Sequence, residues 1–144
     1  MASAMNSPYK EFNAHVKEFV RELDRTFENV WCFKFMMAGY KMLKSMHKSL
    51  PHKYFQELVY LPHGQGIKHC DETTFFDPTY QPPPLYTNLV ESLKGIWKGL
   101  DDETKNTVWK HLNVLCVLNE RCIEYRKSKN MPPIETVDDD KCDD

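Results

Sequence analysis

Residues 100–129 read LDDETKNTVWKHLNVLCVLNERCIEYRKSK, and this stretch decides the fold class. Its first aspartates, Asp101 and Asp102, can cap the free N–H groups of a first helical turn and suit the positive end of the helix dipole. Basic residues gather at the other end, where the dipole is negative. Between the ends, mostly apolar residues recur at helical spacing: Val108, Leu112, Leu115, Cys116, Asn119, Cys122 and Ile123. The stretch predicts one long amphipathic helix, which Met131-Pro132-Pro133 would stop.

Four earlier segments carry a similar pattern. Ser7-Pro8 favours the start of a first helix, and its apolar stripe comprises Phe12, Val16, Phe19, Val20, Leu23 and Phe27. A second helix is expected at about 30–48; it is more apolar and rich in methionine, so we expect it to lie centrally. A short third helix at 52–60 and a fourth from near Leu85 to Gly99 complete the set. The expected fold is an all-α, single-domain helical bundle of four long helices and one short helix within residues 1–130.

Two segments depart from this pattern. Residues 61–84 contain seven prolines and glycines, among them Pro62, Gly64 and Gly66, which disfavour helices and predict a long ordered loop. Residues 131–144 hold six acids and one base, which gives this tail a net charge of −5 and leaves +3 on the rest of the chain. We expect the tail to be disordered and to act as an interaction or solubilising segment.

Compartment and anchoring follow from what the sequence lacks. No stretch approaches the roughly 20 apolar residues of a membrane span, and the first residues do not resemble a signal peptide. Five cysteines at irregular spacing then predict reduced thiols in the cytoplasm or nucleus. We expect an intracellular protein without a membrane partner.

The segment around residue 70 carries the residue types of a metal site. His63, His69 and Cys70 are candidate zinc ligands, and Cys32 or His52 would have to complete the site. The spacing is not that of a zinc finger, so the alternative is a polar loop whose histidines face water. Cys70 beside His69 could form a reactive thiolate, but no oxyanion-stabilising group can be identified. With no catalytic or nucleotide-binding motif, we predict a protein that is not an enzyme and binds no cofactor.

A basic cluster spans the end of the second expected helix and the start of the third. Lys41, Lys44, Lys48 and Lys53 accompany His47 and His52 there. Positions 41, 44 and 48 share one helix face, which could meet phosphates or an acidic partner. The alternative is an ordinary solvated face, since a charge of +3 on the body is small for a nucleic-acid binder.

Aromatic residues suggest further contact points. Trp97 lies on an apolar stripe and is expected in the core, whereas Trp109 lies slightly off its stripe and is a candidate interface residue. Tyr80 and Tyr86 flank Pro82-Pro83-Pro84, a possible polyproline II ligand for an aromatic groove. The alternative for that segment is a stiff lead into the fourth helix.

Two groups of residues carry a resemblance to known proteins. The first comprises Phe19-Val20-Arg21-Glu22-Leu23 and Thr26-Phe27-Glu28; the second comprises Leu93-x-x-Ile96-Trp97-x-x-Leu100 and Lys105-x-x-Val108-Trp109-x-x-Leu112. Over about half of the chain, they resemble small uncharacterised α-helical proteins of large nucleocytoplasmic DNA viruses. The resemblance implies a viral protein in the host cytoplasm, a virus factory or the virion, and it implies no catalytic or ligand residues.

Taken together, these features predict a non-enzymatic protein that binds another protein or serves in an assembly. One alternative is a weak nucleic-acid binder that uses the basic face of Lys41, Lys44 and Lys48. The other is a small zinc-stabilised module around His63, His69 and Cys70.

Overall fold

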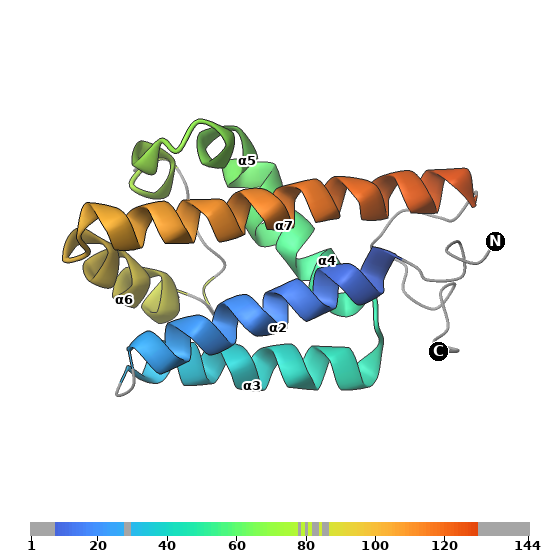
Figure 1. Ribbon diagram of the computed structural model, residues 1–144, viewed down its shortest axis with the longest axis horizontal. Helices are drawn as coiled ribbons and strands as arrows, with labels where there is room; N and C mark the ends of the chain where they lie inside the picture. Colours follow the sequence, from blue (N-terminus) through green and yellow to red (C-terminus); the bar gives the residue numbers. More distant parts are fainter. Residues whose placement is uncertain are drawn as a thin grey trace.

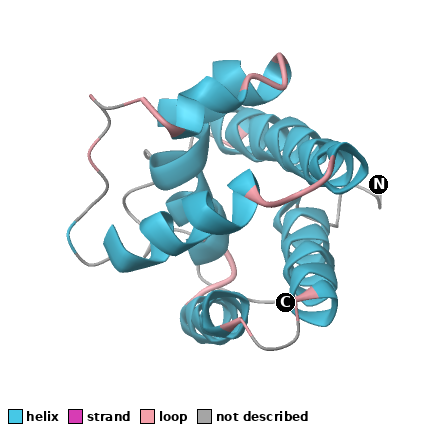
Figure 2. Ribbon diagram, turned by 90° about the vertical axis from the view of Figure 1, so that its left-hand side faces the viewer, coloured by secondary structure: helices cyan, strands magenta, loops and turns pink. Residues whose placement is uncertain are grey.

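The computed structural model describes residues 8–27, 30–77, 79, 81, 84 and 87–129. Every regular element in this part of the chain is helical (Figure 2). The elements, in order, are α2 (Pro8–Thr26), α3 (Trp31–Met46), α4 (Leu50–Phe55), the π-helical turn η1 (Gln56–Tyr60), α5 (Leu61–Lys68), the 3₁₀ turn η2 (Glu72–Phe75), α6 (Thr87–Lys98) and α7 (Asp102–Ser128). The helical class expected from the sequence is confirmed. The acidic tail and the segment with Tyr80, Tyr86 and Pro82-Pro83 lie outside the described residues.

The 27-residue helix α7 runs the length of the molecule (Figure 1). Asp101 caps it as expected, because its carboxylate accepts a hydrogen bond from the backbone N–H of Thr104 at 2.8 Å. Helix α2 lies between α7 and α3, while α4, η1 and α5 cross α7 (Figure 1). This arrangement leaves α3 at the edge of the bundle, so the expectation of a central second helix is wrong.

The expected loop at 61–84 is wrong in its first part. Residues 50–68 form one continuous helical path, in which α4 passes through η1 into α5. Pro62 stands in the first turn of α5, where a missing N–H is tolerated. Gly66 serves a packing role, since a Cβ there would lie 2.5 Å from Cβ of Thr74. The glycine therefore lets η2 approach α5 closely instead of ending the helix.

Two clusters of buried side chains form the core. The first joins α2 to α7 and contains Tyr9, Phe12, Phe19, Leu115, Leu118 and Cys122. The second joins α5 to α7 and contains Ile67, Trp109 and Cys116, with Phe75 and Trp97 packed against it. Because α7 has neighbours on two sides, it buries a wider arc than one apolar stripe, which explains the burial of Trp109.

The interface role expected for Trp109 is therefore wrong, since its side chain is 6% exposed. Its ring stacks on Phe75 at 5.7 Å between centroids and meets Trp97 edge-on at 5.2 Å.

The cysteines in the described part of the chain, Cys32, Cys70, Cys116 and Cys122, are all free thiols. Cys70 is exposed and the other three are buried. None of the described helices combines the length and apolar character needed to cross a membrane.

Candidate protein interface

The outer side of α3 carries a row of large apolar side chains that no described residue covers. Trp31, Phe35, Met42 and Met46 are 51, 49, 58 and 66% exposed; we call these four residues the α3 face. They follow one another at steps of four, seven and four, so they lie along one side of the helix. The rings of Trp31 and Phe35 touch edge-on at 6.0 Å between centroids. On the opposite side, α3 buries Cys32, Phe33 and Tyr40.

Charge around the α3 face has one sign. Between Trp31 and Met46 the helix contains three lysines and no acid. Lys34 forms an ion pair with Asp24 of α2 at 3.0 Å. Lys41 and Lys44 are exposed, and neither forms an ion pair with any residue that the structure describes. At about 100° per residue, Lys34 and Lys41 lie about 60–80° around the helix from Trp31 on one flank of the row, whereas Lys44 lies on the side away from it. The helix thus presents an apolar row with positive charge along one flank.

The basic cluster predicted from the sequence is divided by the fold. Lys53 is 16% exposed, forms an ion pair with Glu57 at 3.4 Å and lies over the ring of Tyr54. Lys48 is half-buried, and its backbone carbonyl accepts a hydrogen bond from Asn13. Of the four lysines, only Lys41 and Lys44 remain exposed, and only Lys41 lies on a flank of the α3 face.

His52, counted with that cluster, is fully buried. Its ring lies 5.7 Å from Tyr9 and 5.4 Å from Phe12 between centroids. Burial, opposed by Asn119 and aided by the nearby Arg126, lowers the pKa of His52 to about 4. The side chain is therefore neutral at pH 7 and is no part of a basic surface.

The candidate zinc ligands are not brought together. His63 is buried, its Nδ1 lies 3.0 Å from Oγ1 of Thr74, and its ring packs on Phe75. His69 and Cys70 are exposed at the end of α5, and Cys70 adopts a left-handed backbone with φ of 52°. Within the described chain, no three His, Cys, Asp or Glu side chains gather in a way that could hold a metal ion.

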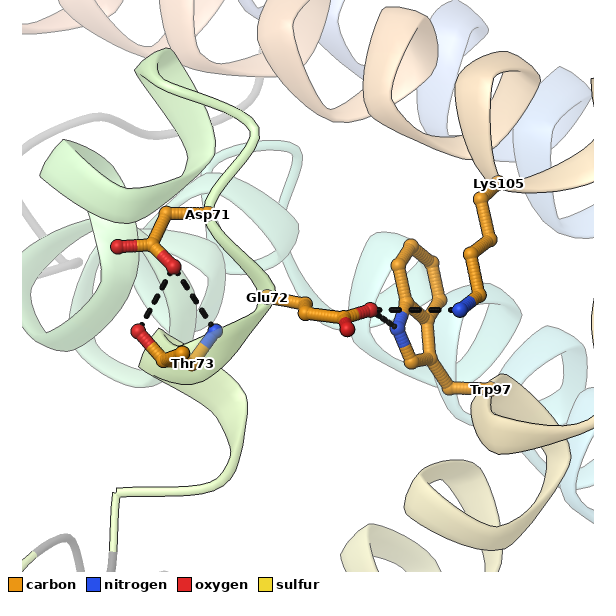
Figure 3. A network of polar contacts seen from close by, with 5 residues as sticks. All are labelled: Asp71, Glu72, Thr73, Trp97 and Lys105. Carbon is orange, nitrogen blue, oxygen red and sulfur yellow. Dashed lines mark hydrogen bonds and ion pairs between the residues drawn. The ribbon is translucent and has the colours of Figure 1, made fainter. Parts of the chain in front are cut away.

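A polar network fastens η2 to the bundle (Figure 3). Trp97 Nε1 donates a hydrogen bond to Glu72 at 2.5 Å, and Nζ of Lys105 lies 3.4 Å from the same oxygen. The bond from Trp97 lowers the pKa of Glu72. Beside it, Asp71 accepts hydrogen bonds from the backbone N–H and hydroxyl of Thr73. These carboxylates are engaged in holding the turn, so the network is structural and offers no acid–base pair.

Comparison with known proteins adds no function. The chain matches no protein-family model, no curated protein and no solved structure. The surfaces described above therefore carry the functional information, and among them the α3 face has the clearest features of a binding site.

The sequence itself contains a signal for this face. The second expected helix has two apolar stripes, one through Phe33 and Tyr40 and one through Trp31, Phe35 and Met42. A helix that is apolar on both sides must either lie inside a core or contact something else.

Proposed function

We propose that this protein is a non-enzymatic interaction protein that docks a partner on the α3 face. The observation that carries the proposal is the uncovered row of Trp31, Phe35, Met42 and Met46. Contiguous apolar patches are uncommon on the surface of a monomer and often mark binding sites. Tryptophan, phenylalanine and methionine are also enriched at the centres of protein interfaces.

The occupant we propose is an amphipathic helix of another protein with acidic residues beside its apolar stripe. Lys34 and Lys41, on one flank of the α3 face, favour an acidic partner and oppose a basic one. Sixteen helical residues span about 24 Å at 1.5 Å per residue, which suits about four turns of a partner helix. A second copy of the chain is a poorer occupant, because the lysines of two α3 helices would meet along one seam.

If the resemblance to proteins of large DNA viruses holds, this partner would belong to a viral assembly or to the host cytoplasm. Both settings are intracellular, as the sequence led us to expect. The proposal for the α3 face does not depend on that assignment.

The direct test uses two synthetic 18-residue amphipathic peptides. Both carry leucines at helical spacing; one is flanked by glutamates and the other by lysines. We expect the acidic peptide to bind and to change the fluorescence of exposed Trp31. Binding should weaken at least about threefold in Lys41→Glu, since a favourable charge contact becomes repulsive, whereas Lys44→Glu, on the side of α3 away from the face, should have a smaller effect.

The matched control places its changes on another exposed apolar site. Val114 and Val117 of α7 are 42 and 49% exposed, and Val114→Ser/Val117→Ser should bind the acidic peptide as the parent does. Equal binding of the two peptides, or binding that is unchanged in Lys41→Glu, would contradict the proposal.

Two further measurements separate other occupants. A photo-crosslinker in place of Met42 that reacts only with residues 130–144 of the same chain, or only with a second copy, would overturn the partner-helix proposal. Binding to duplex DNA that falls steeply with salt, needs Lys41, Lys44 and Lys48, and ignores Trp31→Ser would instead favour nucleic-acid binding.

A further inference from the structure

Two histidines from distant parts of the chain meet where α2 packs on α7. Nε2 of His15 lies 3.2 Å from Nδ1 of His111. The ring centroids are 5.2 Å apart, and the planes are inclined by 41°. Phe19 stacks on the ring of His111 at 4.8 Å, which supports its orientation. Both histidines are partly exposed, so an ion in solution can reach them.

The distance between Nε2 of His15 and Nδ1 of His111 fits a shared metal ion as well as a hydrogen bond. In a tetrahedral zinc site with Zn–N bonds of about 2.0–2.1 Å, two coordinating nitrogens are about 3.3 Å apart. A hydrogen bond between the rings needs one N–H and one lone pair. If the ring that donates moves its proton to its other nitrogen, both facing nitrogens offer lone pairs, and a small rotation of each ring aims them at one point.

We propose that His15 and His111 form a two-histidine binding site for a transition-metal ion, with Zn²⁺ and Cu²⁺ as the ions best matched to imidazole. Water completes the coordination, since the described chain supplies no third ligand at a fixed position. Mg²⁺ and Ca²⁺ prefer oxygen ligands and should not bind.

The surroundings of His15 favour the neutral ring that a metal requires. Burial and then the neighbouring His111 lower the pKa of His15, while Glu18 of α2 acts in the opposite direction. The neutral form of His15 therefore predominates at pH 7, and protons displace the metal ion only under acid conditions. Glu18 also places one negative charge near the bound cation.

A metal ion bound at this site would link α2 to α7. The two histidines are 96 residues apart in sequence. An ion that binds both of them only in the folded protein stabilises that state. This inference is independent of the α3 face, because it involves a different pair of helices and a different readout.

The first experiment uses Cu²⁺ alone with the full-length protein in which Cys70 and Cys142 are replaced by serine, so that these thiols do not compete. We expect one ion per chain and an electron paramagnetic resonance spectrum with two imidazole nitrogens. His15→Gln and His111→Gln should each weaken binding by more than the roughly 10–100-fold typical of losing an outer-shell contact. His69→Gln, which removes an exposed histidine elsewhere, should leave the affinity unchanged.

The second experiment measures thermal stability. Zn²⁺ should raise the melting temperature of the same protein at pH 7.5, whereas Mg²⁺ should not, and the Zn²⁺ effect should disappear at pH 5. A Cu²⁺ spectrum with fewer than two imidazoles, or a zinc effect that survives His15→Gln, would show adventitious binding only and would overturn the proposal.

Discussion

The cluster around Trp109 and the α3 face use similar side chains and differ in what covers them. Trp109 is 6% exposed because Phe75 of η2 and Trp97 of α6 close over it, whereas Trp31 is 51% exposed. Both tryptophans lie on amphipathic helices. The difference shows that helical periodicity identifies residues on one face, while coverage of that face depends on segments far away in the sequence.

The strongest way to test this comparison is to remove each tryptophan. Trp109→Ala should lower the free energy of unfolding by about 3–5 kcal/mol, because it opens a cavity in the core. Trp31→Ala should change it by less than about 0.5 kcal/mol but weaken binding of the acidic peptide. Urea unfolding followed by circular dichroism measures both, and equal losses would show that the α3 face is covered in solution.

The stability of the buried core should also depend on pH, through His52. The pKa of His52 is about 4 in the folded protein and 6.5 is its ordinary value, so the unfolded chain takes up the proton first on acidification. This histidine should therefore cost about 3 kcal/mol of stability between pH 6.5 and pH 4. His52→Phe should remove that part of the pH dependence, while His69→Gln should retain it. An unchanged dependence in His52→Phe would place the loss on other groups.

Two glycines offer a finer comparison. Gly66→Ala should destabilise the protein by about 1–2 kcal/mol, because overpacking against Thr74 exceeds the gain in helix propensity. Gly39 of α3 has open space where a Cβ would stand, so Gly39→Ala should stabilise it by about 0.5–1 kcal/mol. Thermal unfolding of both variants tests this, and the same sign for both would contradict the packing of η2 on α5.

The smallest effect is expected from the contact that holds η2 against α6. The pKa of Glu72 is lowered by the hydrogen bond from Trp97, so its contribution is present above the ordinary pKa of glutamate and disappears as the pH falls through the lowered value. Glu72→Gln should reduce the difference between melting temperatures at pH 7 and pH 3. Because the carboxylate is exposed, we expect a shift of only a few degrees or less. Lys94→Gln, which removes a lysine from α6 outside this contact, is the matched control.

Local signals predicted much of the fold. The cap at Asp101 and the stripe of the last expected helix correspond to α7, and the stripe of the first expected helix corresponds to α2. The prediction failed at 61–68, where Pro62 and Gly66 look like helix breakers. Their roles depend on a helical turn that tolerates proline and on a neighbour, Thr74, that requires a glycine. Neither condition can be recognised from nearby residues alone.

The candidate sites were harder to predict for the same reason. The lysines at 41 and 44 were identified from the sequence, but the apolar row on the same helix was not. Whether Trp31 or Phe33 faces the core is decided by the helices that contact α3, namely α2, α4 and α6. His15 and His111 had no local signal, since 96 residues separate them.

The free thiols have a consequence for following this protein in a cell. Burial raises the pKa of Cys116 to about 11 and also raises the pKa of Cys122, so neither is a nucleophile while the core is closed. Cys70 is exposed and can be alkylated in the native state. The rate at which a reagent marks the buried pair relative to Cys70 therefore reports how often the bundle opens, without any added label.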